Sequence, residues 1–178
     1  MAKTLTARLT LNVGLTHKNV DVGGVANRVP TDRIKHNLTR SWANGTGADQ
    51  TDIPYQVQGT IAGGATTEID LAGVLTDFAG GTLTLADIVG FVCENTSASP
   101  NTAAHIDIGP AASNGICPWL SGTGPKEEVR VGGFVARACG DATGWGGITA
   151  GTGDKLALTN KHGSQTASYK LTLWGRSS

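Results

Sequence analysis

Alternation of apolar and polar residues with a period of two recurs along the chain and limits its fold more than any other feature. Near the N-terminus, residues 4–13 alternate without a break. In the last third, residues 142–175, the pattern returns at 155–160 and 167–174, separated by a Gly-Thr-Gly-Asp bend and a polar turn. This period predicts antiparallel strands with one buried face and one face in water.

Further short segments of the same kind follow one another at intervals typical of an all-β domain. Residues 88–95, IVGFVCEN, are almost wholly apolar and are typical of a central strand. Residues 72–78 favour a single helical turn, and Pro118 predicts an edge or a bend at 116–120. Other strands are expected at 33–42, 55–61, 66–71, 82–87, 104–108, 127–131 and 133–139. The fold expected is an all-β antiparallel sandwich, with a jelly roll as the particular form.

Length and composition agree with a small folded protein of two parts. The chain has 178 residues, 26 of them glycine, with 16% charged residues and no net charge. Periodicity is lost at residues 16–32, where Gly23-Gly24 and Pro30 mark a loop or arm. We therefore expect an N-terminal strand and extended arm at residues 1–32, packed on or swapped from the main domain. The sandwich domain is expected at residues 33–178.

The sequence offers little for catalysis or for binding nucleic acid or membrane. Basic residues are scattered, so nucleic acid is not an expected partner. No apolar run approaches the length of a membrane span, and the start lacks a signal-peptide pattern. Phosphate-binding, nucleophile-elbow and zinc-protease motifs do not occur. The Asp49 and Asp52 pair is typical of turn capping rather than calcium binding. We predict a protein that is not an enzyme, with no catalytic residue, cofactor or metal, made in a cytoplasm.

Three cysteines leave two interpretations open. Cys93, Cys117 and Cys139 form no metal-binding spacing, and their odd number prevents full pairing within one chain. One interpretation is three small buried side chains in a reducing compartment. The other is a disulfide, between subunits or within one, formed after release to an oxidising environment.

Tryptophan supplies four of the nine aromatic residues and marks candidate contact surfaces. Trp174 falls on the polar face of its strand, and Trp145 lies in a glycine-rich loop. The favoured interpretation is packing over an end of the sandwich. A subunit interface and a sugar-stacking site are the alternatives.

Several runs resemble small structural proteins encoded among the virion genes of tailed bacteriophages. They pair a DLAGVLTD segment with later DATG and TAGTGD turns and a final strand. The resemblance covers about residues 35–175. The three cysteines of this chain depart from the family pattern. The matching runs are residues 41–52 (SWANGTGADQTD), 67–88 (TEIDLAGVLTDFAGGTLTLADI), 106–120 (IDIGPAASNGICPWL), 129–160 and 168–175 (SYKLTLWG).

The resemblance implies a structural virion protein, in particular a capsid decoration protein that binds and stabilises the phage head. The partners it implies are the major capsid protein and other copies of the chain, with a homotrimer as the expected state. The location implied is the capsid surface. A receptor- or glycan-binding module of a tail or fibre is the alternative. Interface candidates are Val20, Val22, Val25, Val29, Trp145 and Trp174, and the intersubunit disulfide candidates are Cys93, Cys117 and Cys139.

Overall fold

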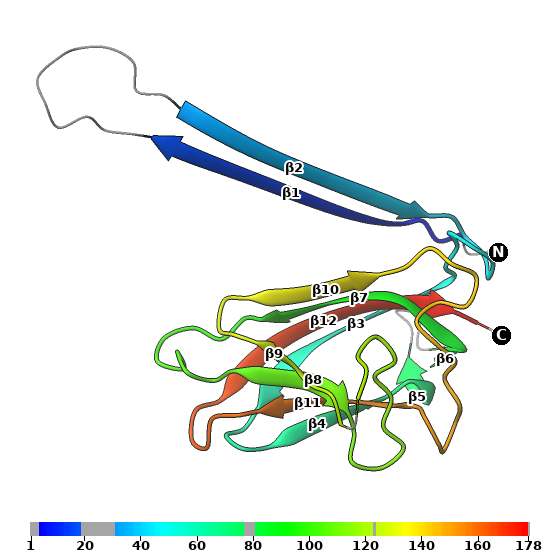
Figure 1. Cartoon of the computed structure of the whole chain (residues 1–178). Coiled ribbons are helices and arrows are strands. Elements are labelled where there is room, and N and C mark those ends of the chain that lie inside the picture. Colours follow the sequence, from blue (N-terminus) through cyan, green and yellow to red (C-terminus); the bar gives the residue numbers. More distant parts are fainter. Residues whose placement is uncertain (1–3, 19–30, 77–80, 123, 178) are drawn as a thin grey trace, which may run out of the picture.

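The computed structural model describes residues 4–18, 31–76, 81–122 and 124–177, and this part of the chain is built from β-strands without a helix (Figure 1). The first strands are β1 (Ala7–Lys18), β2 (Thr31–Trp42), β3 (Ile53–Ile61), β4 (Thr66–Asp70), β5 (Ala72–Thr76) and β6 (Thr82–Thr84). They are followed by β7 (Asp87–Asn95), β8 (Ile106–Pro110), β9 (Glu127–Val129), β10 (Phe134–Ala138), β11 (Lys155–Asn160) and β12 (Ala167–Arg176). The predicted all-β class is confirmed.

Two four-stranded antiparallel sheets form the body of the molecule. One has the order β10-β7-β12-β3 and the other β4-β11-β8-β9. Their facing residues make one core, in which Phe91, Leu171 and Leu173 of the first sheet meet Ile108 and Leu158 of the second. The period-2 sequence produces this arrangement because alternate side chains point into the space between the sheets.

The connections repeatedly cross between the two sheets. From β3 to β12, the chain changes sheet at every step except β8 to β9, apart from the small β5-β6 ribbon at one end. The last strand, β12, lies between β3 and β7 and pairs with both. The C-terminal stretch that carries the clearest alternation is therefore the centre of its sheet.

One expectation about the elements is wrong. Residues 72–76, expected in a helical turn, form β5, because Leu75 is buried and the strand pairs with β6. Of the two alternatives for residues 116–120, the bend is the one found, since 118–120 form a turn and bend outside any strand. The expected domain boundary after Asp32 falls inside β2, which pairs with β1 along its whole length rather than with the sandwich.

β1 and β2 form a long two-stranded ribbon, which we call the arm. Figure 1 shows that the arm leaves one end of the sandwich above β10 and β7 and diverges from the body toward its far end. Each strand has 12 residues, about 40 Å at roughly 3.4 Å per residue. The arm is the feature that most distinguishes this chain from a plain sandwich.

Candidate functional site: an apolar cleft beneath the arm

The pairing register gives the arm one apolar and one polar face. Leu11 lies opposite Leu38, and Thr10 lies opposite Thr39. Since alternate residues of paired strands share a face, Ala7, Leu9, Leu11, Val13 and Leu15 share theirs with His36, Leu38, Arg40 and Trp42. Arg8, Thr10 and Asn12 belong to the opposite, polar face. The two faces follow the sequence prediction for 4–13 and 33–42.

The face predicted to be buried is covered only near the base of the arm. Trp42 is 1% exposed, whereas Leu11 is 36%, Leu38 47% and Leu15 57% exposed. The body contributes one large apolar side chain of this kind in the described residues, Phe134 of β10, at 59%. Every large exposed apolar side chain in the described part therefore belongs to the arm or to the strand of the body nearest to it.

The base of the arm is fixed by Trp42. Its ring lies 5.4 Å from that of Trp174, tilted by 56°, and both pack with Val89 in a small cluster separate from the main core. The Trp42 indole Nε1 donates a hydrogen bond of 2.8 Å to the Cys139 backbone oxygen. Leu5 N donates one of 2.9 Å to Asn44 Oδ1. These contacts set the direction in which the arm leaves the sandwich.

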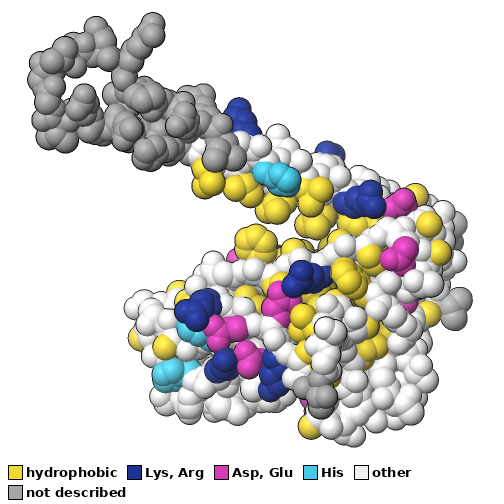
Figure 2. All heavy atoms as spheres, in the orientation of Figure 1, with side chains coloured by type: hydrophobic (Ala, Val, Ile, Leu, Met, Phe, Trp, Pro, Cys, Tyr) yellow, Lys and Arg dark blue, Asp and Glu magenta, His cyan; other side chains and the backbone are white. Residues whose placement is uncertain are grey.

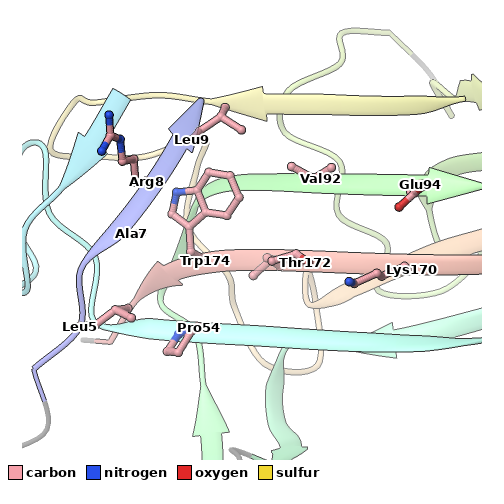
Figure 3. A pocket seen from close by; sticks show the side chains of 11 residues that line it. Leu5, Ala7, Arg8, Leu9, Pro54, Val92, Glu94, Lys170, Thr172 and Trp174 are labelled. Carbon is pink, nitrogen blue, oxygen red and sulfur yellow. The ribbon is translucent and has the colours of Figure 1, made fainter. Parts of the chain in front are cut away.

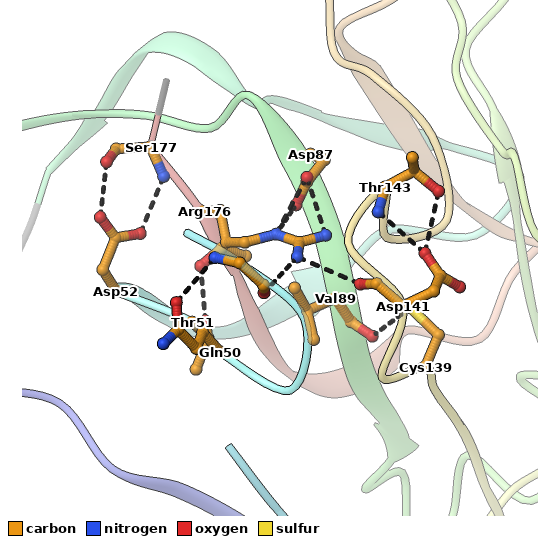
Figure 4. A network of polar contacts seen from close by, with 12 residues as sticks. Gln50, Thr51, Asp52, Asp87, Val89, Cys139, Asp141, Thr143, Arg176 and Ser177 are labelled. Carbon is orange, nitrogen blue, oxygen red and sulfur yellow. Dashed lines mark hydrogen bonds and ion pairs between the residues drawn. The ribbon is translucent and has the colours of Figure 1, made fainter. Parts of the chain in front are cut away.

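A buried arginine ties the C-terminus to the loops beside this base (Figure 4). The Arg176 side chain is 2% exposed, and its Nε and Nη2 each lie 3.0 Å from the Asp87 carboxylate. Its Nη1 donates to the backbone oxygens of Gly47 and Asp141, at 2.7 and 3.1 Å. A second carboxylate, Asp52, accepts from the backbone nitrogen and hydroxyl of Ser177. A buried cation with this many partners holds the loop that follows the arm against the end of β12.

Between the arm and the outer face of the β10-β7-β12-β3 sheet lies an apolar cleft in two parts. The inner part, about 450 Å³, is bordered by Leu5 and Leu9 from the arm side and by Pro54, Val92 and Trp174 from the sheet (Figure 3). The outer part, about 610 Å³, is lined mainly by Leu11, Leu38, Val92, Phe134, Ala136 and Trp145. Figure 2 shows the apolar underside of the arm facing apolar side chains on the body across this gap.

The rim of the cleft is mostly basic. Arg8 and Lys170 border the inner part together with one acid, Glu94, and Arg40 and Arg137 border the outer part. Arg137 is paired with Glu127 at 2.8 Å, and Arg40 lies 3.7 Å from Asp49. Among the described residues, Glu94 has no ion-pair partner. Two of the four basic groups, Arg8 and Arg40, belong to the arm itself, so the sheet contributes only Lys170, the paired Arg137 and the acid Glu94. The cleft can therefore hold apolar side chains.

Charge is divided unequally between the arm and the remainder of the chain. The two arm strands contain five basic residues and one acidic residue, which gives a net charge of +4. Because the whole chain has a net charge of zero, the other residues together carry −4. This separation is hidden in the overall composition and appears only when the arm is defined.

The other charged cluster is a surface network on the second sheet. Lys161 Nζ lies 2.9 Å from Glu128 Oε2, and Arg130 Nε lies 2.9 Å from Glu128 Oε1. The hydrogen bond from Lys161, helped by the charges of Lys161, Arg130 and His105, lowers the pKa of Glu128. The same bond raises the pKa of Lys161. In the described residues no group of three or more His, Cys, Asp and Glu is placed to hold a metal ion.

The cysteines lie in different environments. Cys93 is 0% exposed in the main core and Cys117 is also buried, while Cys139 is partly exposed; all three are free thiols. Burial raises the pKa of Cys93 and of Cys117 to about 12, with the Glu127 carboxylate adding to the shift for Cys117. The pKa of Cys139 is raised to about 11, chiefly by burial. Cys93 and Cys117 fit the interpretation of buried side chains, and Cys139 is the one best placed for an intersubunit disulfide, which stays a prediction.

The other interface candidates are two tryptophans and four valines, and the structure describes only the tryptophans. Trp174 is 7% exposed and packs against Trp42 beneath the arm, rather than over an end of the sandwich as the favoured interpretation had it. Trp145 is half-buried and borders the outer cleft beside Phe134. Val20, Val22, Val25 and Val29 lie outside the described residues. Their part in an interface stays a prediction, as does that of both tryptophans.

The cleft itself was missed by sequence reasoning. The alternation in residues 4–13 and 33–42 identified the apolar faces, but it indicated a buried strand and gave no sign that the two segments pair with each other. Their matching lengths and the turn-rich interval between them were the available signals for a hairpin.

No family model matches this sequence, and the comparisons with curated proteins and with solved structures gave no match. Among the described residues, none form a helix long and apolar enough to cross a membrane. The arm and the cleft are therefore the features of this chain that bear on its function.

Proposed function

We propose that this chain is a structural protein of a phage virion, a decoration protein that binds the head and stabilises it. The observation that carries the proposal is the arm, whose four exposed apolar residues Leu11, Val13, Leu15 and Leu38 lie on one face. An isolated two-stranded ribbon has little stability in water. An exposed apolar patch with a polar rim is typical of a surface that contacts another protein.

The body supports the same proposal. Its strands alternate between two four-stranded sheets in the order β3-β12-β7-β10 and β4-β11-β8-β9. This is the connectivity expected of a jelly roll, a fold common in viral capsid domains. Fold alone carries no function, and it is the projecting arm that favours assembly over ligand binding. Homotrimers on the capsid surface, bound to the major capsid protein, are the arrangement we propose.

Sedimentation with heads tests this proposal. Purified chain is mixed with expanded heads that lack it, and bound protein is measured after pelleting. We expect saturable binding and heads that resist heat and chelation better. Leu15→Glu, on the apolar face of the arm, should weaken binding by roughly tenfold or more, because a charge replaces a contact worth about 1.5 kcal/mol or more. Asn12→Glu adds the same charge to the polar face, away from the residues that line the cleft, and is the matched control.

The competing function is a glycan-binding module of a tail or fibre. It has lost one expected stacking residue, since Trp174 is covered by Trp42. Binding to host surface polysaccharide without binding to heads would overturn the decoration proposal. Equal binding of both arm variants to heads would remove the arm as its basis.

A further inference from the structure

The cleft raises the question of what covers the apolar face of the arm. We propose that a second copy of this chain does so: the arm of one copy packs its apolar face on the outer face of the β10-β7 part of the next copy's sheet. This inference rests on the arm being an assembly element, as proposed above, but not on which particle the assembly joins.

Placement of the exposed apolar residues is the first argument. Leu11, Leu38 and Phe134 are exposed in one chain and border the same cleft. Each copy therefore offers both an apolar strip and an apolar receiving surface. Two copies that exchange arms cover both surfaces at once, whereas an unrelated partner that covers the arm leaves Phe134 and Ala136 in water.

The direction of the arm is the second argument. Its base is held by the burial of Trp42 and by the hydrogen bond to Cys139. From this fixed point the arm diverges from its own body, so that the gap widens toward the far end of β1 and the start of β2 (Figure 1). Leu15, at the far end, is more exposed than Leu11, nearer the base. The far half of the arm is thus directed away from its own body, where the proposed assembly places the next copy.

Charge is the third argument and selects a copy's body over a copy's arm. Two arms of net charge +4 repel each other, while the remainder of the chain carries −4 and attracts an arm. On the receiving surface, Glu94 lies beside Val92 at the cleft and has no ion-pair partner among the described residues. His36 and Arg40, on the apolar face of the arm, are the basic groups able to meet it.

An arm-to-body contact joins two different surfaces, so it is heterologous. Copies joined in this way form either a closed ring or a pair in which each copy's arm packs on the other. The homotrimer expected from the sequence resemblance is the smallest such ring beyond a pair. The contacts are those of an exchanged element, which costs little because one chain supplies both surfaces.

Sedimentation velocity of the full-length chain with two single variants tests the exchange. Leu38→Glu damages the arm and Phe134→Glu damages the receiving surface; both sites are exposed in one chain, so folding should survive and thermal unfolding checks it. Each variant should sediment as a single chain, with self-association weakened roughly tenfold to a hundredfold. The controls are Thr39→Glu on the polar face of the arm and Gln58→Glu on β3, the opposite edge strand of the sheet. Both should assemble as the unchanged chain does.

Mixing the two damaged variants gives the sharpest result. An intact arm on the Phe134→Glu chain meets an intact receiving surface on the Leu38→Glu chain, so a one-to-one pair should form although each variant alone is a single chain. If Phe134→Glu assembles normally while Leu38→Glu does not, the arms pack on each other and the proposal is wrong.

A double variant, Leu38→Cys with Phe134→Cys, separates exchange from closure. After oxidation, a bridge between chains supports exchange, and a bridge within one chain means that the arm folds onto its own body and overturns it. The chain could instead stay monomeric at every concentration and still need Leu38 to bind heads. The arm would then contact the shell protein, which would overturn the exchange but retain the proposed function. Self-association through the arm without any binding to heads would support the exchange and overturn the proposed function.

Discussion

The arm and the sandwich share one sequence pattern but bury it to different extents. In the sandwich, the apolar residues of β12 meet a second sheet, and Leu171 and Leu173 are fully buried. In the arm, the equivalent positions Val13 and Leu15, among the side chains that the structure describes, are 39% and 57% exposed. Periodicity specifies which face is apolar, whereas burial depends on a second layer, which the sandwich has within the chain and the arm does not.

Loss of a large core side chain should give the largest difference between the two regions. Phe91 is fully buried and its ring lies 4.4 Å from that of Trp119. Phe91→Ala should lower the free energy of unfolding by about 3–5 kcal/mol through lost burial and the cavity that remains. Leu15→Ala on the arm should change it by less than about 0.5 kcal/mol, measured by urea unfolding at a concentration where the chain is single. A large effect of Leu15→Ala under those conditions would mean that the arm is covered by its own chain.

Removal of the buried arginine should come next. Arg176→Met leaves the Asp87 carboxylate without its partner and frees the oxygens of Gly47 and Asp141. We expect a loss of about 3 kcal/mol, the lower end for a broken buried pair, because the Asp87 side chain keeps 16% exposure.

The matched control is Arg130→Met, whose ion pair with Glu128 involves a side chain that is 76% exposed. It should lower the free energy of unfolding far less than Arg176→Met does, because water screens an exposed ion pair. Equal losses for the two variants would contradict the role given to Arg176 in joining the C-terminus to the base of the arm.

Trp42→Phe should separate the hydrogen bond at the base from the packing there. The change keeps an aromatic ring beside Trp174 but removes the donor to the Cys139 oxygen. The expected loss is about 1 kcal/mol, the usual net value of one hydrogen bond. Amide exchange should quicken in β1 and β2 and stay unchanged in β12, because the arm is held to the body through this residue. Uniform quickening in both regions would show that the base and the body unfold as one unit.

The sequence predicted the fold class and most strands because alternation is a local property. It identified β12, β11 and β7 closely, since their apolar residues recur without interruption. It was wrong at β5, where a short AGVLT segment pairs with β6 and buries Leu75; that tertiary contact outweighs local propensity.

The candidate site was predictable only in part. The apolar faces at 4–13 and 33–42 could be read directly, but the pairing of Leu11 with Leu38 joins distant residues, and nothing local specifies it. The charge of the arm was also concealed, because a neutral chain gives no sign of two oppositely charged parts. The cleft is a property of two layers and their angle, which a single sequence does not encode locally.

Thiol labelling should give the smallest effect. It compares the labelling rates of the two cysteines in the sandwich core with that of Cys139, which lies beside the base of the arm. Because burial raises the pKa of Cys93 and Cys117 to about 12 and that of Cys139 to about 11, all three are protonated at neutral pH. An electrophilic reagent, which only the thiolate attacks, therefore reacts slowly with them. The rate at Cys139 should rise about tenfold per pH unit up to its pKa, and should exceed the rates at the two buried thiols, which need local opening. Mass spectrometry of the labelled peptides at pH 7, 8 and 9 measures the order, with urea-unfolded chain as the control in which all three react alike. If Cys93 reacts as fast in the folded as in the unfolded chain, the core opens there and Cys93 is as available for a disulfide as Cys139. If Cys139 alone reacts, it is the one thiol available for an intersubunit disulfide, and it lies beside Trp42, which fixes the arm.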